Sequence, residues 1–304
     1  MTKVITIIGA TGRVGAKTVK NLLGKGYTLR LIARSQDKLN EFAGKPGVEI
    51  HAGSATDADF LTKVFAGSDV VLTMMPADFT STNIGAFQDT MGLAQIKAIK
   101  DSGVKHVLNL SSVGGHTEEK TGIVAGLARQ EKRLNELTGV DVLHLRPSYF
   151  MENLLGNIGM IKGMNINGSP IKGDKAFPVI ATDDIAKVVA EKLKAIDWKG
   201  KSVLPLLGPK DYTMNEITAA IGKAIGKPEL PYIQFPYDQA KVAMVQQMGL
   251  TESIADAYNG LSEGVNEGVF NTEKRDAHST TPTTIEQFVS NVFAPAFNGK
   301  AELV

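Results

Sequence analysis

The sequence predicts an α/β fold with a doubly wound parallel sheet, followed by a smaller mixed C-terminal part. Three observations support this prediction. Short apolar runs bounded by turns alternate with longer segments of helical periodicity, which is the pattern of βαβ units. A glycine-rich turn follows the first apolar run directly. The alternation stops near residue 146, and a glycine- and asparagine-rich passage begins soon after it.

The elements follow in order along the chain. Six strands with helices between them are expected at residues 3–8, 28–32, 48–50, 69–74, 105–110 and 141–145. The passage GMNINGSPIKG, residues 163–173, predicts hairpins or a mobile loop. Later helices are expected at about 181–196, 215–225, 238–248 and 283–292. We therefore divide the chain into a nucleotide-binding domain, residues 1–152, and a smaller substrate-binding region, residues 153–304, in which residues 179–196 pack back on the first sheet.

Composition excludes several functions. The 304 residues carry a net charge of +1 without a Lys/Arg cluster, so direct binding to nucleic acid is not expected. The absence of cysteine excludes disulfides and thiol nucleophiles. No histidine pair has the spacing of metal ligands, so no metal is expected, and His51, His106 and His144 are most simply structural. The N-terminal apolar run VITII is too short for a signal or a membrane span, which predicts a cytoplasmic protein without membrane association.

The turn GATGRVG carries the strongest functional signal because a strand precedes it and an amphipathic helix follows it. Gly9 permits a tight turn, Gly12 lets the backbone approach a pyrophosphate, and Gly15 allows the helix to lie close to the strand. This arrangement predicts a dinucleotide site of the Rossmann type, and a glycine-rich turn without a ligand is the less favoured alternative. The other residues of the turn assigned to the cofactor are Thr11, Arg13 and Val14.

The end of the second strand indicates which dinucleotide binds. An NAD-selective site places an acid there to accept a hydrogen bond from the ribose 2′-hydroxyl, but this chain has Arg34. Lys38 follows four residues later, and Arg13 lies in the first turn of the first helix. Each charge alone is consistent with a solvated surface residue, but three cations together suit a 2′-phosphate. We expect NADP(H), with NAD(H) as the weaker alternative.

The chain resembles NmrA-like proteins, a branch of the atypical short-chain dehydrogenases/reductases. The segments GATGRVG, ARSQDKL, GSDVVLTMMP, LNLSSVGG, LRPSYFMENLL and ATDDIAKVVAEKL carry the resemblance, in the order seen in that family. The resemblance implies an NADP-binding Rossmann domain with a small substrate domain, and it assigns Met75, Pro76 and Ser111 to the cofactor site. It also implies one of two functions, since members are either reductases or redox-sensing regulators without turnover.

The catalytic residues of the family are only partly present. In catalytic relatives, a serine after the fifth strand polarises the substrate carbonyl, and Tyr-x-x-x-Lys on the next helix supplies the proton. Ser112 matches the serine, but Ala125 and Arg129 occupy the positions of the tyrosine and the lysine. Ala128 lies where other members keep a lone Lys or His, and Lys132, one turn further on, is a possible substitute or a plain solvated lysine.

Other side chains could take part in the chemistry. Hydride transfer to a quinone, azo or conjugated carbonyl acceptor requires less from the protein, because the cofactor carries the chemistry. His116 is the best predicted proton donor, although an exposed loop histidine is the alternative. Tyr149, Phe150 and Asn153 follow the sixth strand and are assigned to the substrate, with the Tyr149 hydroxyl also a catalytic candidate; core packing is the alternative. The segment Tyr237–Lys241, YDQAK, is interpreted as an incidental match.

The sequence thus predicts an NADPH-dependent reductase of a small apolar or aromatic acceptor such as a quinone, azo compound or conjugated carbonyl. The alternative is a non-catalytic NADP(H)-binding redox sensor that acts through a protein partner. A sugar-nucleotide epimerase is disfavoured by the missing Tyr-x-x-x-Lys. A homodimer or a regulatory protein partner is compatible with either function.

Overall fold

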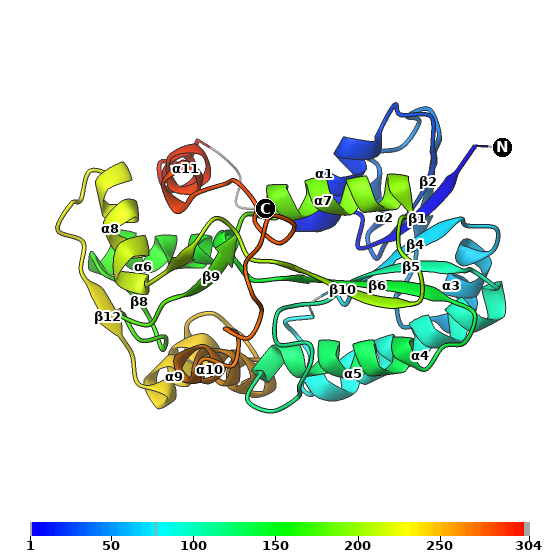
Figure 1. Cartoon of the computed structure of the whole chain (residues 1–304). Coiled ribbons are helices and arrows are strands. Elements are labelled where there is room, and N and C mark those ends of the chain that lie inside the picture. Colours follow the sequence, from blue (N-terminus) through cyan, green and yellow to red (C-terminus); the bar gives the residue numbers. More distant parts are fainter. Residues whose placement is uncertain (1, 77, 301–304) are drawn as a thin grey trace.

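The computed structural model describes residues 2–76 and 78–300. Within these ranges the main sheet has seven strands, all parallel, in the order β10-β6-β5-β4-β1-β2-β3 (Figure 1). The strands are β1 (Val4–Ile8), β2 (Thr28–Ala33), β3 (Val48–Ala52), β4 (Val70–Thr73), β5 (His106–Leu110), β6 (Asp141–Pro147) and β10 (Lys201–Leu206). This sheet confirms the predicted fold class, and all six expected strands are present.

The seventh strand, β10, was not expected. It pairs only with β6 and so forms one edge of the sheet. Its sequence KSVLPL contains a proline and alternates between exposed and half-buried residues. Proline is tolerated on an edge strand, where a backbone N–H can be absent from the ladder. The run therefore lacks the continuous apolar signal of the inner strands, which are buried on both faces.

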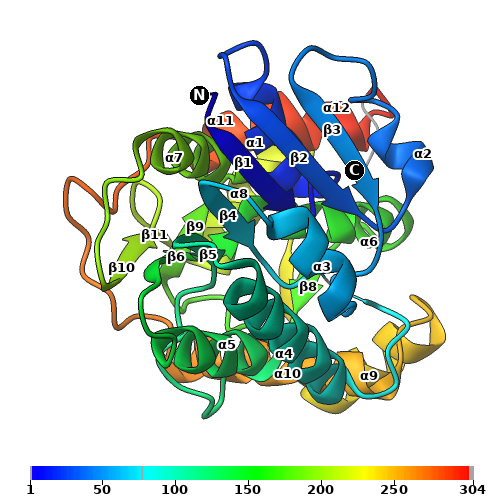
Figure 2. The ribbon, with the colours of Figure 1, turned by 90° about the vertical axis from the view of Figure 1, so that its right-hand side faces the viewer.

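Helices cover both faces of the sheet (Figure 2). On one face, α1 (Arg13–Leu22) and α7 (Thr182–Ala195) pack against each other, with the short α2 (Gln36–Leu39) beside them. On the other face lie α3 (Ala58–Phe65), α4 (Ile84–Ser102) and α5 (Ala125–Asn135). Because α7 and β10 come from the second half of the chain, the polypeptide leaves the first unit after β6 and later returns to it.

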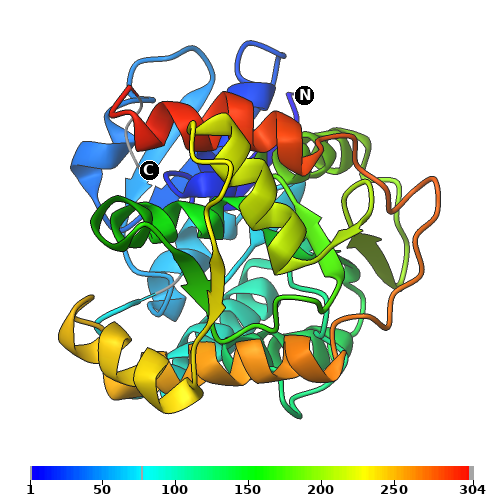
Figure 3. The same ribbon diagram turned by 90° about the vertical axis from the view of Figure 1, so that its left-hand side faces the viewer.

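The C-terminal part lies beyond the carboxyl ends of the strands (Figure 3). It holds two small sheets, formed by β7 (Tyr149–Phe150), β9 (Phe177–Ile180) and β11 (Asp211–Tyr212), and by β8 (Asn167–Ser169) and β12 (Tyr232–Gln234). Its helical segments are a 3₁₀ stretch Met151–Asn157, α6 (Ile158–Met164), α8 (Met214–Ala224), α9 (Tyr237–Gln246), α10 (Glu252–Glu267), α11 (Ile285–Phe288), a π-helical turn Val289–Phe293 and α12 (Ala294–Phe297). These segments enclose a separate apolar core.

Two expectations for this region were wrong. Residues 163–173 do not form a hairpin, because β8 pairs in parallel with β12, more than sixty residues later in the chain. The helix α10 was not expected at all. Its residues Gly260 and Gly264 interrupt the apolar pattern, and the structure explains Gly264: a Cβ there would lie 2.1 Å from the carbonyl oxygen of Lys120. A Cβ on Gly122 would likewise lie 2.1 Å from the Ala257 carbonyl oxygen, so α10 packs backbone to backbone on residues 120–124.

Candidate functional site

The site lies at the carboxyl edge of the parallel sheet. The chain proceeds from β1 to β2 and β3 on one side and from β4 to β5 and β6 on the other, so the loops after β1 and β4 diverge between these two strands. Ligands of open α/β sheets bind in the crevice at such a switch point. Among the described residues, the segments that meet this edge are 9–15, 33–38, 74–76, 78–83, 111–124 and 147–153.

The three glycines of the first turn differ in what the protein requires of them. Gly9 has φ +70°, and a Cβ there would lie 2.5 Å from Sδ of Met74. A Cβ on Gly15 would lie 2.0 Å from the carbonyl oxygen of Gly9, so the close contact of helix and turn excludes any side chain. Gly12 is exposed and has ordinary extended geometry; among the described residues the nearest atom to a Cβ there is that same oxygen, at 3.3 Å. Packing and backbone geometry therefore constrain Gly9 and Gly15 far more strongly than Gly12.

Gly12 lies at a helix N-terminus, a position suited to a phosphate group. Gly12 caps the N-terminus of α1, where free N–H groups and the helix dipole favour an anion. Arg13 is the first residue of the helix and is exposed, Thr11 is half-buried and Val14 is buried. The binding of a pyrophosphate by this turn remains a prediction.

The cations assigned to the 2′-phosphate have different neighbours. Arg34 follows β2 and Lys38 lies in α2, and both are exposed. Arg34 acts on Asp78, whose pKa is lowered mainly by hydrogen bonds from Thr80 and to a lesser extent by this arginine. Burial raises the pKa of Tyr258 in α10, and the positive charge of Arg13 partly opposes this rise. The convergence of all three cations on one phosphate remains a prediction.

A hydrogen bond from α4 fixes the backbone at the carboxyl end of β4. Gln95, fully buried on α4, donates from Nε2 to the Met74 carbonyl oxygen at 2.8 Å. Met75 and Pro76 follow and are half-buried. Their predicted contact with the cofactor is compatible with this position at the switch point.

A buried ionic chain fixes the end of β5. Ser111 donates its hydroxyl to Oε1 of Glu131 on α5. Arg146, in β6, binds both oxygens of Glu131, with Nε–Oε1 2.9 Å and Nη2–Oε2 2.7 Å, and its Nη1 reaches Oε1 of Glu273 at 2.9 Å. A Cβ on Gly115 would lie 2.5 Å from Glu131 Oε1, so the backbone after β5 packs directly against this carboxylate. The Ser111 hydroxyl therefore holds the protein together, and a cofactor contact by this residue would involve its backbone.

Ser112 lies beside this chain and is half-buried. Its hydroxyl donates to the carbonyl oxygens of Val113 at 2.9 Å and of Pro147 at 3.5 Å. A polarising role toward a substrate carbonyl would require it to exchange these acceptors for the ligand, so this role remains a prediction.

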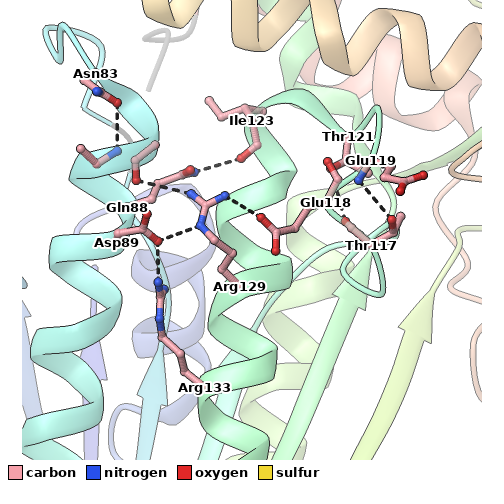
Figure 4. A network of polar contacts seen from close by, with 12 residues as sticks. Asn83, Gln88, Asp89, Thr117, Glu118, Glu119, Thr121, Ile123, Arg129 and Arg133 are labelled. Carbon is pink, nitrogen blue, oxygen red and sulfur yellow. Dashed lines mark hydrogen bonds and ion pairs between the residues drawn. The ribbon is translucent and has the colours of Figure 1, made fainter.

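The structure explains why Arg129 is not a catalytic lysine equivalent (Figure 4). Its Nε binds Oδ1 of Asp89 on α4 at 2.7 Å, and its Nη1 binds Oε2 of Glu118 at 3.1 Å. Arg133 binds the same Asp89 oxygen at 2.6 Å. Burial opposes ionisation of Asp89, but hydrogen bonds from Arg133 and Arg129 outweigh it and lower the pKa of the carboxyl group. Arg129 thus ties α5 to α4, and Ala125 provides no functional group.

His116 does not share a cavity with the glycine-rich turn. It is exposed and lines a shallow hollow of about 580 Å³ together with Lys132, Glu131 and Arg146. The lining of this hollow comes from residues 115–118, α5 and β6, and contains no residue of the glycine-rich turn. The proton-donor role of His116, and the substitute role of Lys132, therefore gain no support from the geometry.

The residues after β6 face two different cores. Tyr149 packs edge-on against Phe177, with ring centroids 5.5 Å apart, in the C-terminal core. Phe150 packs against the core beneath α1 and α7, which favours the core-packing alternative for it. Burial raises the pKa of Tyr149, Tyr258 adds to this effect, and the side chain of Asn153 opposes it. Asn153 is exposed.

Sequence reasoning missed Glu152, which joins the two halves of the chain. Both of its carboxylate oxygens accept from the Thr182 backbone N–H at 3.0 Å, where α7 begins. Lys17 of α1 reaches the same carboxylate at 3.5 Å and the Thr182 hydroxyl at 2.9 Å. A buried acid in an apolar segment is a signal for such a structural role, because unpaired buried charges are strongly disfavoured. Glu131 carries no local sequence signal of its role, because its partners Ser111 and Arg146 lie 20 and 15 positions away.

His144 has a structural role, as expected. His144 is 1% exposed and lies between Asn109, 3.2 Å from its Nδ1, and Asn135, 3.0 Å from its Nε2. Burial lowers its pKa to about 4. In residues 2–76 and 78–300, no group of three His, Cys, Asp or Glu residues could hold a metal ion, and no helix is long and apolar enough to cross a membrane.

The chain belongs to the NmrA-like family, which it matches over residues 1–289. A curated relative, the NAD(P)H azoreductase of Xenophilus azovorans, is 29% identical over 257 residues, which cover 84% of this chain and 85% of the relative. The NADPH-dependent quinone oxidoreductase QOR2 of Escherichia coli has the same fold, with a TM-score of 0.78, 22% identity, and coverage of 95% of this chain and 99% of the other. NmrA, a negative transcriptional regulator solved in complex with NADP, has a TM-score of 0.67, 15% identity, and coverage of 99% and 98%.

Proposed function

We propose that this protein is an NADPH-dependent reductase of a small apolar or aromatic acceptor, in the class of quinones, azo compounds and conjugated carbonyls. The observation that carries the cofactor assignment is the exposed Gly12 at the N-terminus of α1, which of the three glycines meets the weakest packing constraint. The azoreductase supports the reductase class, because it is similar over most of both chains.

The chain's own residues would bind and orient the two reactants. When bound, a reduced nicotinamide supplies a hydride, so the protein must hold the acceptor beside it, exclude water and provide a proton. The turn 9–15 would hold the pyrophosphate, with Arg34 and Lys38 beside the 2′-phosphate. The ends of β4, β5 and β6, with the C-terminal core behind Tyr149, would form the wall facing an apolar acceptor.

One observation favours the alternative, a non-catalytic sensor of NADP(H). The helix α5 offers no Tyr-x-x-x-Lys, and Arg129 is committed to Asp89 and Glu118. A sensor would bind cofactor and change its affinity for a protein partner without turnover.

A direct assay separates the two functions. Wild-type protein saturated with NADPH is mixed with a naphthoquinone, a monoazo dye and an enone, and oxidation is followed at 340 nm. Turnover above the buffer rate with at least one acceptor supports the reductase. NADPH binding without oxidation of any of the three contradicts it and favours the sensor.

The glycine turn provides a matched pair of variants for the cofactor site. Gly12→Ala should fold with only a small loss of stability, since its Cβ would lie 3.3 Å from the Gly9 carbonyl oxygen, but should bind NADPH at least 10-fold more weakly because the methyl group occupies the pyrophosphate's space. Gly15→Ala should lose stability instead, because its Cβ meets backbone at 2.0 Å. Calorimetric titration and thermal unfolding of both variants test this. Unchanged NADPH affinity in folded Gly12→Ala would show that the turn does not bind the cofactor.

A further inference from the structure

We propose that Tyr258 of α10 supplies the proton for acceptor reduction, the task that a tyrosine on α5 performs in catalytic relatives. This inference rests on the proposed reductase function. It assigns the missing donor to the C-terminal part of the chain, where no sequence motif points to it.

The helix α10 packs on segments that follow β4 and β5, at the carboxyl edge of the main sheet (Figure 3). At the N-terminal end of the helix, the Thr251 hydroxyl donates to the Ser81 carbonyl oxygen in the β4–α4 loop at 2.5 Å. Further along, Gly264 lies directly against the backbone of Lys120, in the segment that follows β5. Tyr258 lies between these two contacts, so it is held between the loops that follow β4 and β5.

The backbone next to Tyr258 contacts the segment after β5, since a Cβ on Gly122 would lie 2.1 Å from the carbonyl oxygen of Ala257. We infer that the Tyr258 side chain lies near the proposed site. It is half-buried and lies within electrostatic range of both Arg13, at the start of α1, and Tyr149, just after β6. These two residues belong to the segments assigned to cofactor and acceptor, respectively. Tyr258 thus interacts electrostatically with one residue of each segment.

The hydroxyl of Tyr258 is available to a ligand. Three of the other tyrosine hydroxyls are engaged: Tyr232 donates to the Ile171 carbonyl oxygen at 2.6 Å, Tyr237 accepts from Asn266 at 2.8 Å, and Tyr212 accepts from the Ile285 N–H at 3.3 Å. For Tyr258, no hydrogen bond of the hydroxyl is found within residues 2–76 and 78–300. A half-buried hydroxyl without a protein partner is suited to bind a polar atom of the acceptor.

Electrostatics favours Tyr258 over Tyr149 as the donor. Burial raises the pKa of Tyr258, but the positive charge of Arg13 opposes this effect and would stabilise the tyrosinate that forms after proton transfer. Burial also raises the pKa of Tyr149, two neighbouring tyrosines add to this effect, and its one opposing contact is the uncharged side chain of Asn153. A donor must become an anion in the transition state, so the cation beside Tyr258 is the relevant difference.

The step balances with one proton from solvent. Addition of a hydride to one nitrogen of an azo bond leaves an electron pair on the other nitrogen. The O–H bond of Tyr258 breaks, an N–H bond forms on that nitrogen, and the tyrosinate recovers a proton from water. A hydrazo anion is a strong base and needs this donor, whereas a hydroquinone anion is a weak base and leaves without one. The requirement for Tyr258 should therefore depend on the acceptor.

The test compares Tyr258→Phe with Tyr237→Phe on the neighbouring helix α9, whose hydroxyl is bonded to Asn266. With the azo dye, kcat of Tyr258→Phe should fall about 10²-fold or more, the usual contribution of a general acid. With the naphthoquinone, kcat should change by less than about 5-fold. The azo rate of this variant should also become proportional to proton concentration between pH 6 and 9, because solvent then supplies the proton. NADPH affinity by calorimetry should remain as in wild type, and Tyr237→Phe should behave as wild type throughout.

Three outcomes would overturn the assignment. Unchanged azo reduction by Tyr258→Phe would show that another group donates, and a rise in KM alone would make Tyr258 a binding residue. An equal loss with azo dye and quinone would mean that the substitution disturbs the site as a whole. Failure of the proposed function is recognised separately, because wild-type protein would then oxidise NADPH with neither acceptor.

Discussion

The buried ionic chain of Ser111, Glu131, Arg146 and Glu273 allows a quantitative prediction. Replacing Arg146 by Met keeps much of the side-chain volume but removes the cation that binds both carboxylates. The Glu131 side chain is 5% exposed and would keep the Ser111 hydroxyl as a hydrogen-bond donor. The two hydrogen bonds that it accepts from the guanidinium, at 2.9 and 2.7 Å, would no longer form.

The expected loss of stability follows from the desolvated charge that remains. Removing one partner of a buried ion pair typically destabilises a protein by about 3–5 kcal/mol, since the other charge is left without compensation. Global stabilities are about 5–15 kcal/mol, so Arg146→Met should remove at least about a fifth of the total. For a chain of this length, that loss corresponds to a fall in Tm of roughly 5–8 °C. The double variant Arg146→Met/Glu131→Gln should recover at least half of the loss, because the more deeply buried of the two carboxylates is then neutral.

Urea unfolding followed by circular dichroism measures these differences, with equal m-values as the check that only stability has changed. The exposed pair Lys210–Glu216, 3.4 Å apart and about half exposed on both sides, is the control. Lys210→Met should change stability by less than about 1 kcal/mol. A loss for Arg146→Met no larger than that for Lys210→Met, or a double variant less stable than the single one, would refute the assignment of a buried and coupled pair.

Three further outcomes are expected. Arg34→Asp should weaken NADPH binding, by about 1.5–3 kcal/mol for each charge-assisted hydrogen bond to the phosphate that is removed, and should improve NADH binding. Equal affinity of the wild type for both cofactors in calorimetric titration would contradict this. Acidification from pH 7 to pH 4 should destabilise the fold by up to about 3 kcal/mol through His144, because its pKa of about 4 lies below the unfolded value of about 6.5 and only the unfolded chain takes up a proton in that window. His144→Gln should flatten this part of the stability profile, and identical profiles in urea titrations at several pH values would argue against it. Arg129→Ala should lower Tm while leaving kcat for quinone within about 3-fold, because its partners are Asp89 and Glu118 rather than the site; a loss of 10²-fold would restore it to the catalytic group.

The parallel sheet and the glycine turn can be predicted from the amino-acid sequence, because both depend on local patterns. A strand buried on both faces must be continuously apolar, and a tight turn under a helix must carry Gly9 and Gly15, so both features can be recognised within a dozen residues. The sequence also showed that α5 lacks the catalytic pair, since that absence is read from the residues Ala125 and Arg129 themselves.

Contacts between segments that are distant in the sequence are seen only in the folded structure. The edge strand β10 and the parallel pair β8–β12 gain their stability from partners elsewhere in the chain, and neither has a continuous apolar signal of its own. Arg146 pairs with residues 15 and 127 positions away, and α10 forms because its glycines fit against residues 120–124. Such pairings depend on the relative placement of whole elements, for which local propensity carries no information. For the same reason Tyr258, which reaches the carboxyl edge of the sheet only through the packing of α10, could be recognised from the folded chain alone.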